Sequence, residues 1–187
     1  MRLARPLGAL ATLGGVYVLV ARGSLTVDLG LGRSVRTLGP QVVRIRAPRP
    51  VVFDVIAAPY LGRTPRALAG KLRVLERSDA MVLADHYTKV GPLTTTTSET
   101  VRFEPPERVH FRLVRGPVPH VVEQFELRET EEGTELEYTG ELGADLWALG
   151  RWWSRRVALR WEAAVRASLE SVQVEAERRA ASAARGA

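Results

Sequence analysis

The chain has 187 residues, of which 45% are hydrophobic and 26% charged, so its composition fits one globular domain with an appendage and excludes a largely disordered protein. The formal net charge is +6, but only Lys71 and Lys89 are lysines and the arginines are scattered along the chain, so we predict no nucleic-acid partner. The absence of cysteine excludes a disulfide framework and a thiolate metal site.

The N-terminal segment is apolar. Residues 7–21 carry no charge and are flanked by Arg5 and Arg22. In a helix they would span about 22 Å, which is less than the roughly 30 Å hydrocarbon core of a bilayer. Adding Leu3 and Ala4, with Arg5 reaching the headgroups, brings the segment close to a full span. We expect residues 1–22 to form a single-pass membrane anchor, with the main domain on the cytoplasmic side that the positive-inside rule favours. A cleaved signal peptide and a buried or surface helix remain alternatives.

The next segment is rich in glycine and poor in bulky apolar residues, which predicts a linker over residues 23–40. Alternating apolar and charged residues predict a first strand at residues 42–47. Pro50 suits the first turn of a helix over residues 51–57, and Pro59 is expected to end that helix. A second helical turn is expected at residues 60–69.

After Gly70 the apolar residues change from a helical period to a period of two, which predicts six further strands. We expect them near residues 72–74, 81–83, 93–104, 109–113, 121–127 and 136–142. The loops between them are short, as in an antiparallel meander. Several strands have one apolar and one charged face, which indicates a sheet with one face on a core.

The last segment predicts one long amphipathic helix from Asp145, a favourable N-cap, to about residue 179. Its apolar stripe recurs at three- and four-residue steps and comprises Leu146, Leu149, Trp153, Val157, Trp161, Val165, Leu169 and Val172. Trp152 and most arginines of the segment are expected on the outward face, which is either solvated or in contact with anionic lipid. So long a helix needs a broad apolar surface, and strands curled around it would supply one.

The order strand, two helices, six strands and long helix resembles the START-like superfamily, also called SRPBCC, over about residues 41–178. The resemblance is carried by VRIRAPRPVVFDVIAAP at residues 43–59, by the hairpin ending at residues 133–136, and by the closing helix with Trp147, Trp152 and Trp153. It implies an α+β helix-grip fold, with a seven-stranded antiparallel curved sheet around the C-terminal helix. We therefore expect a ligand-binding domain over residues 41–180 and a flexible tail over residues 181–187, with the N-terminal hydrophobic helix as an addition.

The resemblance also implies a cavity between the sheet and the last helix that holds a hydrophobic ligand. The expected lining residues are Phe53, Met81, Leu83, Val101, Phe103, Phe111, Leu113, Phe125, Tyr138, Trp153, Val157 and Trp161. The family has no universal catalytic motif, so the resemblance implies no particular reaction.

A few polar side chains are weak candidates for chemistry in such a cavity. Glu123 and Glu99 share strand faces with apolar residues, where an unpaired carboxylate is costly and its pKa would rise. For Glu123, a position at the sheet rim or a pair with Arg115 is the alternative. Tyr138 is either a core residue with one bonded hydroxyl or part of the site, and His86 is either a half-exposed strand residue or an acid–base group. No metal-ligand spacing is present, so we predict no metal or cofactor.

We expect a non-catalytic protein that binds a lipid or other hydrophobic small molecule while tethered to a membrane. The alternative is a polyketide cyclase or dehydrase-type enzyme, in which Glu123, His86 and Tyr138 move protons on a bound apolar substrate. A module that binds a protein partner is a third interpretation.

Overall fold

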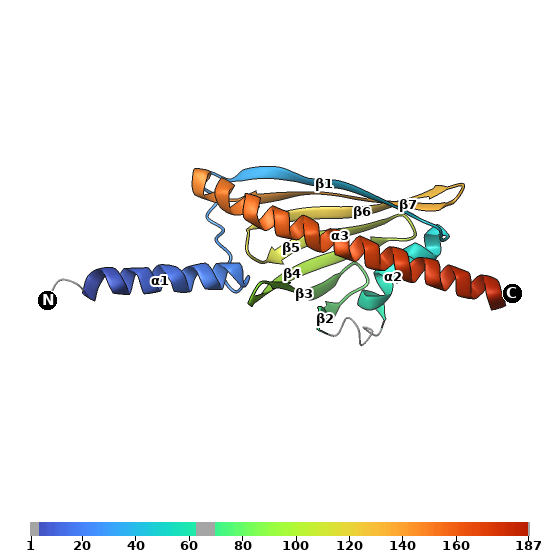
Figure 1. Ribbon diagram of the computed structural model, residues 1–187, viewed down its shortest axis with the longest axis horizontal. Coiled ribbons are helices and arrows are strands. Elements are labelled where there is room, and N and C mark those ends of the chain that lie inside the picture. Colours follow the sequence, from blue (N-terminus) through green and yellow to red (C-terminus); the bar gives the residue numbers. More distant parts are fainter. Residues whose placement is uncertain (1–3, 63–69, 187) are drawn as a thin grey trace.

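The computed structural model describes residues 4–62 and 70–186. These described residues form three helices, α1 (Ala4–Ala21), α2 (Arg49–Leu61) and α3 (Trp147–Gly186). The strands are β1 (Ser34–Ile45), β2 (Leu72–Arg77), β3 (Val82–Val90), β4 (Leu93–Glu104), β5 (Arg108–Arg115), β6 (His120–Thr130) and β7 (Gly133–Ala144) (Figure 1). Most of the expected helical turn at residues 60–69 lies outside the described residues.

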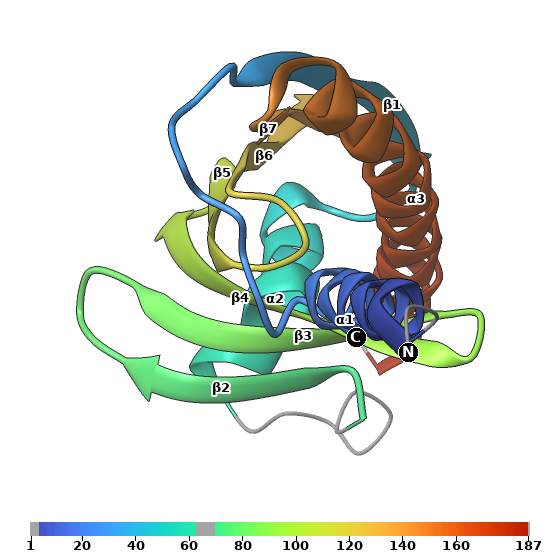
Figure 2. The same ribbon diagram turned by 90° about the vertical axis from the view of Figure 1, so that its left-hand side faces the viewer.

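The seven strands form one antiparallel sheet in the order β1-β7-β6-β5-β4-β3-β2. Each strand from β2 to β7 pairs with its sequence neighbour, because the connecting loops are short. The first strand then pairs with the last. The sheet curls, and α2 and α3 lie on its inner side (Figure 2). The predicted curved antiparallel sheet with a long closing helix is confirmed.

The core lies between the inner face of the sheet and the two helices. Alternate residues of the central strands are buried, including Val101, Val109 and Leu136, while α3 contributes Val165 and Leu169. Burying a side chain of this size contributes about 1.5–3 kcal/mol to stability. Trp153, Val157, Trp161 and Val172 also pack against this core, so most of the predicted apolar stripe of the last helix is confirmed.

Several element boundaries differ from the sequence prediction. α3 continues to Gly186, so the segment expected to be a flexible tail at residues 181–187 is helical as far as Gly186. β1 begins at Ser34, inside the segment expected to be a linker, because its first half pairs with β7 from Ser34 opposite Ala144 to Leu38 opposite Gly140. α2 does not end at Pro59 but continues to Leu61. A proline at this point is followed by only two helical residues, so it disturbs little of the helix.

The start of α3 also differs from the prediction. Leu146 and Trp147 have φ angles of 74° and 46°, and the helix begins at Trp147. The carboxylate of Asp145 is not an N-cap, because it accepts hydrogen bonds from residues 29–33 instead. Leu149 is 60% exposed and leaves the predicted stripe, because the sharp turn at Leu146 sets the orientation of the first helical turn.

The N-terminal segment forms helix α1, but the prediction of a membrane anchor at residues 1–22 is wrong. Among the helices that the structure describes, none is both long enough and apolar enough to cross a membrane. α1 has 18 residues, which at 1.5 Å per residue correspond to about 27 Å, less than the roughly 30 Å hydrocarbon core. This finding overturns the predicted single-pass localisation.

Candidate functional site

A buried carboxyl group lies on the inner face of β6. Glu123 is 8% exposed, and its Oε2 accepts hydrogen bonds from the Tyr138 hydroxyl at 2.8 Å and from the Trp161 indole N–H at 2.7 Å. Glu123 faces Gly140 on β7. A Cβ on Gly140 would lie only 2.7 Å from the Cβ of Glu123. The glycine therefore provides the space that the Glu123 side chain needs. Tyr138 then reaches it diagonally across the strand pair.

Burial changes the protonation of this group. Desolvation, together with the nearby charge of Glu99, raises the pKa of Glu123 to about 8, although the hydrogen bonds from Tyr138 and Trp161 act in the opposite direction. Burial and the Glu123 charge also raise the pKa of Tyr138 above its ordinary value. The environment of Glu123 therefore favours the neutral carboxyl over the carboxylate.

A second polar cluster lies on the inner face of β3 and β4. The His86 ring places Nε2 2.9 Å from the Tyr60 hydroxyl and Nδ1 3.4 Å from Oε2 of Glu99. Oε1 of Glu99 accepts a hydrogen bond of 2.7 Å from the Thr97 hydroxyl, and Glu99 is 5% exposed. Tyr60 comes from the last turn of α2, and burial together with the charges of Glu99 and Glu123 raises its pKa.

Aromatic rings surround both clusters. Phe111 and Phe125 meet edge to face with their centroids 5.3 Å apart, and Phe125 meets Tyr138 at 5.8 Å. On the other side, Tyr60 contacts both Phe111 and Phe103. Such edge-to-face pairs stabilise a fixed arrangement of rings. The carboxyl groups are therefore held in a mainly apolar interior.

Most of the predicted cavity residues lie in this interior. The buried core includes Phe53, Val101, Phe111, Leu113, Phe125 and Tyr138, and Phe103, Trp153, Val157 and Trp161 pack against it. Met81 and Leu83 do not belong to the core. Met81 is 42% exposed and precedes β3, in which Val82 and Ala84 are buried, so the predicted alternation was displaced by one residue.

The candidate polar residues lie in two places. Glu123 and Tyr138 are bonded to each other, whereas His86 belongs to the cluster of Glu99 and Tyr60. The alternative pair of Glu123 with Arg115 does not form, because the Arg115 guanidinium donates to the Ser98 hydroxyl at 3.3 Å. In the described part of the chain, no three His, Asp or Glu side chains gather as metal ligands would.

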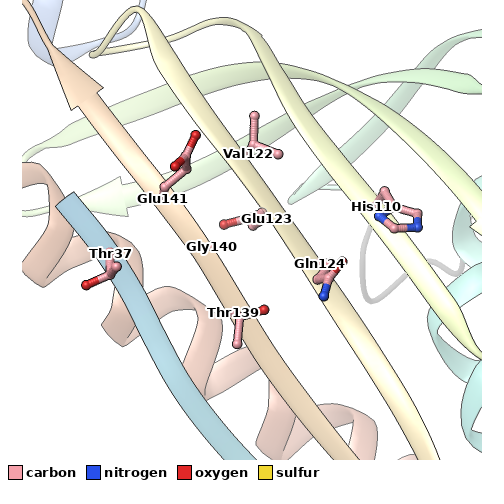
Figure 3. A pocket seen from close by; sticks show the side chains of 8 residues that line it. All are labelled: Thr37, His110, Val122, Glu123, Gln124, Thr139, Gly140 and Glu141. Atoms are coloured by element: carbon pink, nitrogen blue, oxygen red, sulfur yellow. The ribbon is translucent and has the colours of Figure 1, made fainter. Parts of the chain in front are cut away.

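Two depressions open on the outer surface of the fold, and Glu123 contributes to the lining of the first. One, of about 300 Å³, lies on the outer face of the sheet above Gly140 (Figure 3). It is lined by Thr37, His110, Val122, Glu123, Gln124, Thr139, Gly140 and Glu141. The other, of about 410 Å³, lies beside the hairpin between β6 and β7 and is lined by residues 46–49 and 129–133. Neither contains the hydroxyl groups of Tyr60 and Tyr138 or the Trp161 ring.

The sequence reasoning missed Tyr60 as a member of the inner site, and it placed Trp161 in the cavity wall without its bond to Glu123. Tyr60 follows Pro59, where the helix was expected to end, so no local signal placed its hydroxyl inside the sheet. The bond between Trp161 and Glu123 joins residues 38 positions apart. The inward stripe of the last helix and the inward face of β6 were each visible in the sequence, but their alignment depends on how far the sheet curls.

The sequence matches a known protein family over most of its length. The family described as "Polyketide cyclase / dehydrase and lipid transport" matches residues 40–177. The sequence matches no curated protein. The chain belongs to the polyketide cyclase / dehydrase and lipid transport family.

Several solved structures are similar. The Zhui aromatase/cyclase from Streptomyces sp. R1128 is 18% identical with a TM-score of 0.64, and the match covers 78% of this chain and 96% of that one. The di-domain ARO/CYC BexL from the BE-7585A biosynthetic pathway is 20% identical with a TM-score of 0.60, over 94% of this chain and 60% of that one. A protein from Thermus thermophilus is 16% identical with a TM-score of 0.56, over 77% and 94% of the two chains. At these identities the likeness shows a shared fold.

Proposed function

We propose that this domain binds a hydrophobic small molecule, such as a lipid, between the inner face of the sheet and α3. The observation that carries the proposal is the buried Glu123 carboxyl, held by Tyr138 and Trp161 inside an aromatic wall. Placing a carboxyl group in an apolar interior costs free energy, and such groups concentrate at functional sites. A family that includes lipid transport agrees with this proposal.

The inner polar groups favour a ligand with an oxygen at one end. Oε2 of Glu123 already accepts two hydrogen bonds, so the proton of the neutral carboxyl belongs on Oε1. That proton can be donated to a carbonyl or hydroxyl oxygen of the ligand. The apolar body of the ligand would then lie along Phe103, Phe111 and Phe125.

A second candidate function is acid–base catalysis on a bound apolar substrate of the polyketide type. The observation that favours it is the pair of buried carboxyl groups, Glu99 and Glu123, because the charge of Glu99 helps to raise the pKa of Glu123. Acid–base enzymes use pairs of titratable groups whose surroundings give them different pKa values, so that one group is an acid and the other a base. Glu123 would donate a proton, and the cluster of Glu99, His86 and Tyr60 would accept one.

Native mass spectrometry and titration with a fluorescent fatty acid test the binding proposal. We expect the purified protein to retain an apolar small molecule, or to take up the probe in a 1:1 complex. Glu123→Gln should weaken binding by less than about tenfold, because an amide can still donate a hydrogen bond. Glu141→Gln on the outer face of β7 is the matched control and should bind as the wild type does.

Two other results would contradict or change the binding proposal. A protein that carries no ligand and takes up no probe contradicts the binding proposal. If Glu123→Gln keeps its affinity for a polyketide analogue but loses about 10²–10⁴-fold in turnover, the domain is an acid–base enzyme.

A further inference from the structure

The segment between α1 and β1 crosses one end of the curled sheet. We name residues 22–33 the strap. It leaves the C-terminal end of α1 near β4, passes the loop between β5 and β6, and reaches the start of α3 and β1 (Figure 2). Its two ends are attached by different sets of contacts.

The first end is attached to β4 and to the β5–β6 loop. The Thr96 N–H donates to the Arg22 carbonyl at 2.9 Å, and the Thr95 hydroxyl donates to the Ala21 carbonyl at 2.8 Å. The Thr26 hydroxyl donates to the Gly116 carbonyl at 2.8 Å and accepts from the Gly116 N–H at 3.0 Å. Gly23, with a φ of +69°, lies so close to β4 that a Cβ would be 2.0 Å from the Thr96 carbonyl oxygen. Only glycine allows this approach.

The second end is attached at the start of α3, through the Asp145 side chain and through two backbone bonds, from the Leu146 N–H to the Leu31 carbonyl at 2.8 Å and from the Trp147 N–H to the Gly32 carbonyl at 3.0 Å. The Asp145 side chain is 1% exposed, and its oxygens accept hydrogen bonds from the Leu29 N–H at 2.6 Å, the Gly30 N–H at 2.7 Å and Nε of Arg33 at 2.7 Å. The Arg33 guanidinium and the two backbone donors hold the pKa of Asp145 at about 2, so the group is charged in ordinary buffers. A Cβ on Gly32, whose φ is +60°, would lie 2.3 Å from the Trp147 ring.

These attachments lie over the interior. Thr95, Thr97 and Glu99 lie in sequence on the same buried face of β4. The contact of Thr95 with the Ala21 carbonyl is therefore on the face of the strand that also carries Glu99 of the inner site. On the α3 side, the Trp153 indole N–H donates to the carbonyl of Pro117 at 2.7 Å, next to the Gly116 that Thr26 of the strap contacts. The eight residues from Trp153 to Trp161 correspond to about 12 Å along the helix. The strap therefore crosses the end of the fold about two helical turns from the Glu123 carboxyl.

The strap is held mainly by polar contacts and buries little apolar surface. Leu25, Leu29 and Leu31 are between 41% and 56% exposed. Segments with few buried apolar contacts open at a lower free energy than the core. The strap can therefore detach from β4 or α3 while the sheet and α3 remain folded.

We propose that the strap is a gate over the interior, latched by Asp145, and that a ligand enters and leaves when this latch releases. The proposal rests on the proposed binding function. The latch is a charge-assisted contact between two parts of the chain more than 110 residues apart, and none of its residues belongs to the inner site.

Hydrogen exchange and the kinetics of a fluorescent fatty acid test the gate. In Asp145→Asn we expect the Leu29 and Gly30 amides to exchange at least about tenfold faster, because a charge-assisted hydrogen bond is lost. The association and dissociation rates of the probe should rise by a similar factor, with little change in Kd. Gly32→Ala should have the same effect without a change of charge, because the new methyl group meets the Trp147 ring.

Glu175→Gln is the matched control, since Glu175 is also paired with arginines but lies far along α3. It should leave the probe kinetics unchanged. If Asp145→Asn folds poorly, Thr26→Val, which breaks the attachment to Gly116, carries the same expectation. The gate is contradicted if the strap amides exchange faster while both probe rates stay at the wild-type values. A wild-type protein that binds no probe would instead overturn the proposed function, and the gate with it.

Discussion

At the scale of single residues, Glu123 determines the character of the interior. An acid buried in a core is normally paired with a base, but Glu123 is held by the neutral donors Tyr138 and Trp161. Burial raises the pKa of Glu123, and the charge of Glu99 raises it further. The folded protein therefore favours the neutral acid, which can donate a hydrogen bond where a carboxylate could only accept one.

This protonation predicts a pH dependence of stability. The pKa of Glu123 rises from 4.5, the ordinary value, to about 8 in the folded state, so between these values the folded protein binds more protons than the unfolded chain. Stability conferred by the neutral group is present below pH 4.5 and is lost as the pH rises toward 8, at most by about 1.4 kcal/mol per pH unit. The Glu123→Gln variant has no titratable group at this position, so its stability lacks this pH dependence. We expect urea unfolding to show the wild type losing stability relative to Glu123→Gln between pH 5 and pH 8. A constant difference would show that Glu123 is ionised in the folded protein.

At the scale of elements, the spacing of apolar residues correctly predicted those features that depend on local sequence alone. The alternation over residues 93–104 gives β4 with its observed bounds, and the stripe through Trp153, Trp161 and Leu169 gives the inner side of α3. The strand pairing of residues 34–38 was not predictable, because the partner lies about a hundred residues away on β7.

The same reasoning explains the other differences between the predicted and observed structure. Asp145 has the residue type of an N-cap, but the strap supplies stronger donors to its carboxylate than the first turn of α3 does. Glu123 was identifiable as an acid on an apolar face, whereas its partner Trp161 and the neighbouring Tyr60 cluster depend on packing. Local sequence identified candidate groups but could not show which of them meet.

The packing of α3 gives a prediction at this scale. Leu169 is 1% exposed in the core, whereas Leu159 on the same helix is 68% exposed. Leu169→Ala should lower the free energy of unfolding by about 2–5 kcal/mol, because it removes buried methyl groups and leaves a cavity. Leu159→Ala is the control and should change it by less than about 0.5 kcal/mol. Chemical denaturation measures both, and equal effects would mean that α3 packs on the sheet through a different face.

At the scale of the whole molecule, the curled sheet, α2 and α3 enclose a ring of aromatic side chains with two polar clusters, and the strap crosses one end. The outer face of the sheet carries the exposed charges, such as Arg128 with its partners Glu126 and Glu137. The interior holds Glu123, Tyr138 and Tyr60, whose pKa values are raised mainly by burial. The polar groups that could contact a ligand therefore lie in the interior. The central claim is that a hydrophobic ligand binds there, between the inner face of the sheet and α3.

Photoaffinity labelling with a diazirine-bearing fatty acid, followed by peptide mass spectrometry, tests this claim most directly. We predict that the label attaches to residues of the inner face, such as Phe111, Phe125 and Trp161, and that an excess of unlabelled fatty acid prevents it. Labelling confined to exposed apolar residues, such as Val122 on the outer face or Trp152 on α3, would contradict the account.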